Sequence, residues 1–143
     1  MPGSPVIPGL RYRDAPVAID FLCDAFGFTR HAIHADDADP TIIHHAQLAL
    51  GDGMVMVGSV RDGDDESLIT WKTPRDLDGV TLCTYVVVAD VDAHCLHARN
   101  LGAVVVREPR DNEGYPGRGY EALDPEGNLW SFGTYDPWGD YST

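Results

Sequence analysis

The sequence predicts an α+β protein made of two tandem βαβββ modules, whose curved mixed sheets surround a shared cavity. Three kinds of landmark recur in the same order along the 143 residues. The aspartates before two predicted helices are 76 residues apart, the glycines that end those helices 75, and the hairpin glycines 74. Such self-similarity at one period indicates duplication of a supersecondary unit. The landmarks are Asp14 and Asp90, Gly27 and Gly102, and Gly53 and Gly127.

The first module is predicted over residues 6–59. A helix follows Asp14, because apolar residues between 18 and 25 recur at i, i+3, i+4 and i+7 and so form one face. Gly27 stands where a helix-ending residue is expected. Asp52-Gly53 predicts a hairpin turn, since both residue types tolerate positive φ. Strands are expected at 6–13, 28–35, 42–50 and 54–59.

The second module is predicted over residues 80–135. A continuous β-branched run at 80–89 is typical of a buried strand, and a helix from Asp90 to Leu101 follows it. The remaining strands are expected at 103–107, 119–123 and 128–135, with a loop at 108–117. The two modules form one domain over residues 1–143, with a charged connector at 60–79 and a tail at 136–143.

The charge balance excludes some partners. Twenty-three acidic residues against ten Lys and Arg give a formal net charge of −13. Nucleic acid and anionic lipid both require basic patches, so neither is an expected partner. An acidic surface does favour the approach of a cationic ligand.

The chain carries no targeting or spanning signal that we recognise. Residues 1–8 lack the basic and apolar regions of a signal peptide, and no apolar run approaches the roughly 18 residues of a membrane span. Cys23, Cys83 and Cys95 are an odd number without a CxxC pair, which favours free thiols in a reducing compartment. We therefore expect a cytoplasmic protein.

Several segments, taken in order, resemble the vicinal oxygen chelate superfamily, which includes glyoxalases, bleomycin resistance proteins and extradiol dioxygenases. The resemblance covers residues 6–135 and implies the paired-module fold and, in many members, symmetric homodimers. Its carriers are residues 10–14 (LRYRD) leading into 18–22 (AIDFL) with Gly27-Phe28, residues 88–93 (VADVDA) with 101–103 (LGA), and the closing 124–130 (DPEGNLW).

The resemblance also implies where a metal would bind. Family metalloenzymes place ligands seven residues before each pre-helix aspartate and four after each hairpin glycine. Here those positions hold Ile7, Cys83, Val57 and Ser131. Two are hydrocarbons without a lone pair, whereas divalent metals need oxygen or imidazole ligands. We therefore expect no cofactor and no metal at these positions. This departure points to the bleomycin-resistance-like branch, whose members bind a drug without metal chemistry of their own.

The alternation of strand residues sorts the expected cavity face from the core face. Trp130, Phe132, Met54 and Met56 are assigned to the helix-covered side. Trp71, in the connector, is a candidate lid that stacks on a ligand, as is Trp138 near the C-terminus; packing at a subunit interface is the alternative for each. The predicted ligand-binding set is His45, Gln47, Val57, Cys83, Tyr85, Glu121 and Ser131, together with Trp71.

Three functions remain open, the third being a purely regulatory or structural domain. The first is sequestration of a small cationic or aromatic molecule, with apolar walls supplying affinity and Glu121 orientation. The second is an enzyme of the superfamily (a lyase, isomerase or dioxygenase), in which His45 and Glu121 act as an acid–base pair or bind a displaced divalent metal. His94 and His97 share an i, i+3 helix spacing and are interpreted as a solvated face.

Overall fold

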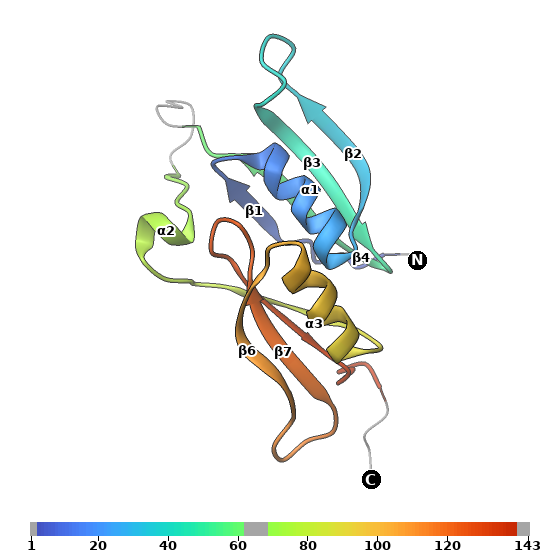
Figure 1. Cartoon of the computed structure of the whole chain (residues 1–143). Coiled ribbons are helices and arrows are strands. Elements are labelled where there is room, and N and C mark those ends of the chain that lie inside the picture. Colours follow the sequence, from blue (N-terminus) through green and yellow to red (C-terminus); the bar gives the residue numbers. More distant parts are fainter. Residues whose placement is uncertain (1–2, 62–68, 140–143) are drawn as a thin grey trace.

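The computed structural model describes residues 3–61 and 69–139 and confirms the α+β fold. The first module contains a four-stranded sheet of order β1-β4-β3-β2, in which β1 runs parallel to β4 and the other pairs are antiparallel. Figure 1 shows this module in blue to green. Its elements are β1 (Gly9–Tyr12), α1 (Ala15–Phe26), β2 (Thr29–Ala35), β3 (Ile43–Leu50) and β4 (Gly53–Ser59).

The second module repeats this topology. Its sheet has the order β5-β8-β7-β6, with β5 parallel to β8 and antiparallel pairs elsewhere. Its elements are β5 (Cys83–Val87), α3 (Val91–Asn100), β6 (Val104–Asp111), β7 (Arg118–Leu123) and β8 (Leu129–Gly133). No helix among the described residues is long and apolar enough to cross a membrane.

The predicted helix signals are present in both modules. The Asp14 carboxylate accepts a hydrogen bond from the backbone N–H of Val17 at 3.3 Å, and Asp90 accepts one from Ala93 at 3.0 Å. Each bond satisfies a backbone donor that the first helical turn leaves unpaired. Gly27 ends α1 with a φ of 90°, a left-handed conformation that favours glycine.

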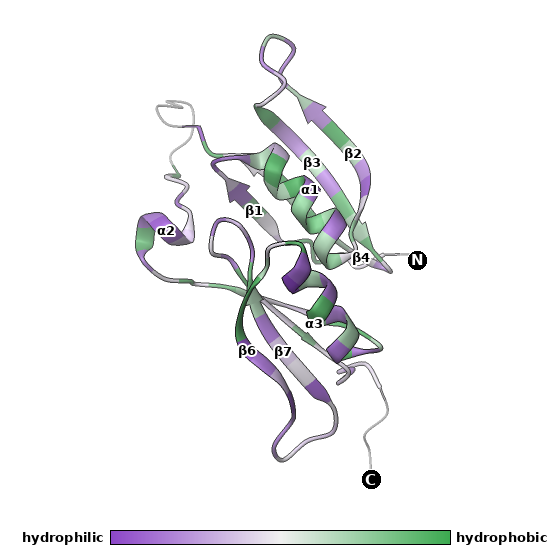
Figure 2. Ribbon diagram, viewed as in Figure 1, coloured by the Kyte–Doolittle hydropathy of each residue, from purple (hydrophilic) through white to green (hydrophobic). Residues whose placement is uncertain are grey.

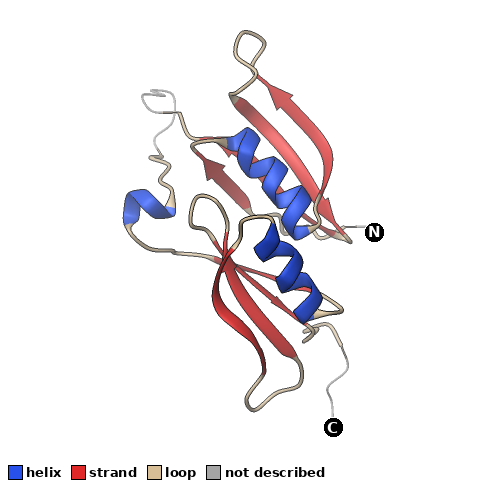
Figure 3. Cartoon of the chain, in the orientation of Figure 1, coloured by secondary structure: helices blue, strands red, loops and turns tan. Residues whose placement is uncertain are grey.

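Both long helices lie on the same side of the two sheets (Figure 3). Phe26, at the end of α1, packs across the module boundary against Trp130 and Phe132 of β8, with ring centroids 5.4 and 4.7 Å apart. Figure 2 shows α1 as largely hydrophobic, as expected for a helix whose side chains enter a shared core. The opposite face of each sheet is therefore open.

The closing 124–130 segment ties the second module to the first. Tyr12 of β1 donates a hydrogen bond to the Asp124 carboxylate at 2.6 Å. The Glu126 carboxylate accepts from the backbone N–H groups of Arg13 and Asp14, at 2.6 and 2.9 Å. These two residues immediately precede α1, so a turn of the second module supplies acceptors for backbone donors at the start of the first module's helix.

Some details differ from the prediction. The strand expected at 80–89 is shorter, and every second side chain of β5 is exposed, so the continuous run does not mark a buried strand. The connector holds a short helix, α2 (Pro74–Leu77), and its residues 62–68 lie outside the described part. His94 is half-buried and bonded to Tyr120 at 2.6 Å, so the solvated-face prediction was wrong for this residue.

Candidate functional site

The open face of the second sheet carries a row of polar side chains from three adjacent strands. Tyr85 on β5 is paired with Ser131 on β8, which is paired with Glu121 on β7. Trp130 on β8 points to the other face and is fully buried. Side chains alternate along a strand, so the structure places Tyr85, Glu121 and Ser131 on the predicted face. Cys83 lies two residues before Tyr85 and shares this face.

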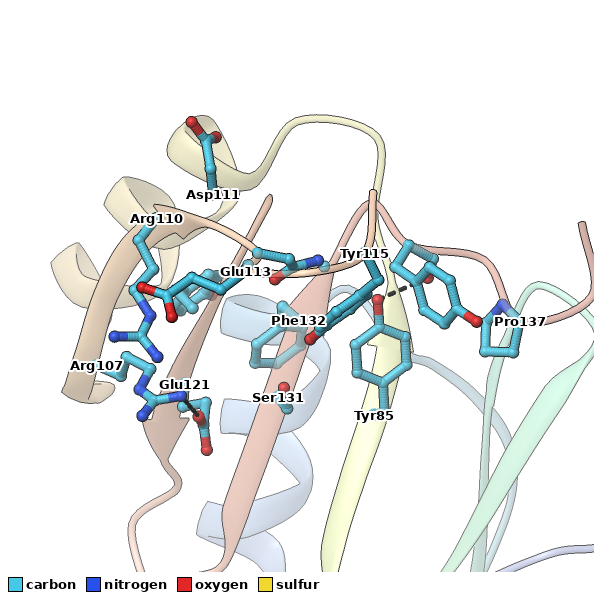
Figure 4. Close-up of a pocket in the computed structure, with 15 residues that line it drawn as sticks. Tyr85, Arg107, Arg110, Asp111, Glu113, Tyr115, Glu121, Ser131, Phe132 and Pro137 are labelled. Carbon is cyan, nitrogen blue, oxygen red and sulfur yellow. Dashed lines mark hydrogen bonds and ion pairs between the residues drawn. The ribbon is translucent and has the colours of Figure 1, made fainter. Parts of the chain in front are cut away.

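A hollow of about 580 Å³ lies over this row. Figure 4 shows side chains from β5, β6, β7 and β8 and from two flanking loops converging on it. The volume falls within the range of small-molecule sites. The residues that carry its chemistry are Tyr85, Arg107, Arg110, Tyr115, Glu121, Ser131 and Tyr135.

Tyrosines form one wall of the hollow. Tyr85 donates a hydrogen bond through its hydroxyl to the backbone carbonyl of Tyr135 at 2.6 Å. The ring of Tyr135 meets that of Tyr115 edge-on, with centroids 5.2 Å apart. A Cβ added at Gly133 would lie 2.6 Å from the Tyr85 hydroxyl, so glycine is needed for Tyr85 to lie across β8. These contacts hold the tyrosines in place, and the wall presents aromatic surface to a ligand.

The opposite wall is charged. Glu121 forms an ion pair with Arg107 of β6 at 3.3 Å, and its side chain is 26% exposed. A carboxylate inside a cavity must be paired or take a raised pKa, and here Arg107 is the partner. Arg110, on the same strand, also lines the hollow, and Figure 4 shows it on the Arg107 side, opposite the tyrosines. Asp111 and Glu113 also line the hollow, so it offers three carboxylates and two guanidinium groups to a bound molecule.

His45 and Gln47 lie on the open face of the other sheet. Their side chains contact each other, with 3.0 Å between His45 Nε2 and Gln47 Nε2. Gln47 is paired with Met56 just as Glu121 is paired with Ser131, so Gln47 and Glu121 occupy equivalent positions of the two modules. Within one chain, however, His45 and Glu121 lie on different sheets and line no common hollow among the described residues.

The predicted face of Val57 is wrong. Val57 is 1% exposed and is paired with buried Ala46 on the helix-covered side, while Met56 takes the open position. The assignment of Met54 and Met56 to the core is wrong for the same reason. The β3–β4 hairpin pairs Leu50 with Gly53, whereas five residues separate the paired ends of β7 and β8. Counting from the turn glycine is therefore off by one residue in the first module.

The family's metal positions are thus occupied by Ile7, Met56, Cys83 and Ser131. None supplies a carboxylate or an imidazole, the ligands that hold oxygen-polarising metals. Burial raises the pKa of the Cys83 thiol, and the nearby Glu121 charge raises it further, which disfavours the thiolate that binds metals. These residues do not fit a metal, and no cluster of three His, Cys, Asp or Glu suited to one occurs in the described ranges.

Trp71 lies away from the tyrosine-lined hollow. Its ring stacks under the Arg11 guanidinium, 4.5 Å from the ring centroid. Both residues line a second hollow of about 390 Å³ between the connector and β1. The lid predicted for Trp71 would therefore cover β1 rather than the row that contains Glu121.

Some lining residues were not predicted from the sequence. Arg107 and Arg110 lie on β6, which continues to Asp111 through a segment expected to be a loop. Tyr115 and Tyr135 flank the hollow from the loop after β6 and from the segment after β8. The ion pair between Glu121 and Arg107 could have been predicted only if the register of β6 against β7 had been known.

Comparisons with known proteins agree with this architecture. The family model described as Glyoxalase/Bleomycin resistance protein/Dioxygenase superfamily matches residues 6–132. The crystal structure of TioX from Micromonospora sp. ML1 is 30% identical, covers 92% of this chain and 98% of that one, and superposes with a TM-score of 0.71. No curated protein matches the sequence.

Two more distant structures share the fold. A glyoxalase/bleomycin resistance protein/dioxygenase family enzyme from Burkholderia phytofirmans PsJN is 18% identical, with a TM-score of 0.62 over 87% of this chain and 93% of that one. A glyoxalase I mutant from Zea mays is also 18% identical, with a TM-score of 0.67 over 89% of this chain and 43% of that one. From the family match and the TioX likeness together, the chain belongs to the glyoxalase/bleomycin resistance protein/dioxygenase superfamily.

Proposed function

We propose that this protein binds and sequesters a small aromatic molecule in the hollow of its second sheet, without metal chemistry at the family's ligand positions. The observation that carries the proposal is the tyrosine wall facing a Glu121–Arg107 ion pair across about 580 Å³. Aromatic walls supply stacking area, and a few convergent polar groups fix orientation.

The charges of the hollow refine the ligand class. Glu121 attracts a cationic group, in keeping with the acidic chain, but it is already paired with Arg107. A cation therefore gains less from Glu121 than it would from an unpaired carboxylate. The other two lining carboxylates, Asp111 and Glu113, are exposed to solvent, which screens their charge, so aromatic contact supplies most of the affinity. The two arginines can also donate hydrogen bonds to an acceptor on the ligand.

The hollow favours binding over catalysis. Ser131 is its only nucleophilic hydroxyl on the central strand, and no histidine lines the hollow in the described part of the chain. A serine nucleophile needs an adjacent base. The alternative enzyme, with His45 and Glu121 as an acid–base pair, requires the two open sheet faces to meet across two copies of the chain.

Such a pairing of copies is part of the proposal. The open face of the second sheet exposes apolar side chains, with Val87 and Val104 exposed to 47% and 57%. A symmetric homodimer would cover them and close the hollow.

Ligand titration tests the binding proposal. Untagged protein with EDTA is titrated with proflavine, a planar aromatic cation, and with anilinonaphthalene sulfonate, an aromatic anion, and binding is followed by probe fluorescence. Saturable binding of either probe is expected, with Tyr115→Ala weakening it at least about tenfold, since stacking groups often dominate such sites. Trp71→Phe, in the other hollow, is the control and should leave affinity unchanged. Absence of saturable binding of both probes, or an effect of Trp71→Phe equal to that of Tyr115→Ala, would overturn the proposal.

A further inference from the structure

Two histidines face each other on the open side of the first sheet. His34 of β2 and His45 of β3 are directly paired in the antiparallel register. Their rings are nearly parallel, at 16°, with centroids 6.1 Å apart. Directly opposed side chains on adjacent strands are held close by the backbone ladder rather than by the side chains themselves. The pair is therefore fixed in place by the fold.

This separation suits one shared metal ion. An imidazole nitrogen binds Zn²⁺ at about 2.0–2.1 Å, so two rings that share an ion have centroids roughly 5–6.5 Å apart. The observed 6.1 Å lies within that range. The two rings are stacked, and the lone pair of an imidazole lies in its ring plane, so both rings must rotate about their side-chain bonds to direct one nitrogen each at a shared ion. The backbone pairing of the two strands keeps the histidines close during that rotation.

The neighbouring glutamine favours the metal-binding form of His45. The Gln47 amide nitrogen lies 3.0 Å from His45 Nε2. In the neutral tautomer that carries its proton on Nδ1, Nε2 accepts a hydrogen bond from this amide through its lone pair. That lone pair is available to a metal once the amide turns aside, and the amide oxygen can then serve as a further ligand.

We propose that His34 and His45 bind a late first-row divalent transition metal ion, with Cu²⁺ held more tightly than Ni²⁺ or Zn²⁺. Imidazole nitrogen suits these ions, and the order follows their general affinity for nitrogen ligands. His34 is exposed, so water completes the coordination sphere. The site lies on β2 and β3, whereas the family's ligand positions lie on or next to β1, β4, β5 and β8. It is therefore a separate site, independent of the aromatic ligand proposed above.

Metal titration of the untagged chain tests the proposal. Cu²⁺, Ni²⁺ and Zn²⁺ are titrated separately at pH 7.5 by isothermal calorimetry, and the Cu²⁺ complex is recorded by electron paramagnetic resonance. One ion per chain is expected, with nitrogen hyperfine structure from two imidazoles. His34→Ala and His45→Ala should each weaken binding at least about tenfold, because removing a ligand costs no less than removing its supporting group.

Matched histidine variants provide the controls. His31→Ala lies on the same strand and His97→Ala on α3, and both should bind metal as the wild type does. Circular dichroism confirms that each variant is folded. A wild type that binds no ion, a double variant His34→Ala/His45→Ala with unchanged affinity, or an equal loss in His31→Ala would each overturn the site. Probe binding in EDTA is measured separately, so failure here leaves the aromatic-binding result distinct.

Discussion

Asp124 is a buried carboxylate whose oxygens are all engaged by donors. It is 3% exposed and accepts hydrogen bonds from the Tyr12 hydroxyl at 2.6 Å and the Trp130 indole at 3.1 Å. Backbone N–H groups of Glu126 and Asn128 add two more at 3.0 Å each. Burial, and next the Asp124 charge, raise the pKa of Tyr12 well above 10, so the phenol stays a donor. A buried charge is tolerated only when it is bonded in this way.

Replacing Asp124 should therefore destabilise the protein strongly. Asp124→Ala leaves the buried Tyr12 hydroxyl and Trp130 N–H without their acceptor, at about 1–3 kcal/mol for each unpaired group. We expect the free energy of unfolding to fall by at least about 2 kcal/mol in urea titrations. Asp37→Ala, an exposed aspartate in the β2–β3 turn, is the control and should change it little. Equal stability of the two variants would contradict this role for Asp124.

At the scale of elements, α3 holds a histidine against the second sheet. His94 bonds to the Tyr120 hydroxyl at 2.6 Å, and its ring lies 4.4 Å from that of Phe132 and 6.4 Å from that of Phe26. Burial lowers the pKa of His94 below 6.5, and the nearby His97 lowers it further. The packing of α3 between the sheet and α1 thus depends on an uncharged imidazole.

The lowered pKa of His94 makes the free energy of unfolding fall as the pH decreases. The unfolded chain takes up the His94 proton near pH 6.5, whereas the folded chain resists it, so the unfolded state binds more protons below that pH. The stability contributed by neutral His94 is present above pH 6.5 and is lost as the pH falls from there toward the lowered pKa. We expect the wild type to lose more unfolding free energy than His94→Gln between pH 7.5 and 5.5. Parallel pH profiles for the two proteins would rule out this contribution.

At the scale of the whole molecule, the two long helices, α1 and α3, lie on one side of the two sheets (Figure 1). The other face of each sheet is left open. We expect light scattering after gel filtration to give twice the mass of a single chain. Val104→Asp, on the open face, should shift the protein to monomer, because a charge would replace apolar contact. Leu96→Asp on the outer side of α3 is matched in exposure, at 59% against 57%, and should remain dimeric. A monomeric wild type, or dissociation by Leu96→Asp alone, would exclude this interface.

Local signals in the sequence predict the two modules, whereas strand register and pairing between strands decide the details of the site. Repeated aspartates and glycines predicted both modules, because caps and turns are local signals. Tyr85, Glu121 and Ser131 were placed on the correct face because the last hairpin follows its turn glycine without a register change. Val57 was misplaced since turn length, not sequence likeness, sets strand register. The Arg107–Glu121 pair depends on irregular β6–β7 pairing, which no local pattern reveals.

The contact between Tyr12 and Asp124 also bears on how the chain is made. These residues are 112 positions apart, and Glu126 reaches back as far to the start of α1. A chain emerging from the ribosome must therefore carry its first module, with Phe26 uncovered, until the final hairpin has been synthesised. Long-range closure of this kind slows folding and prolongs exposure of apolar surface. A chain truncated before residue 124 should consequently have a first module that does not fold as an independent unit and depends on chaperones.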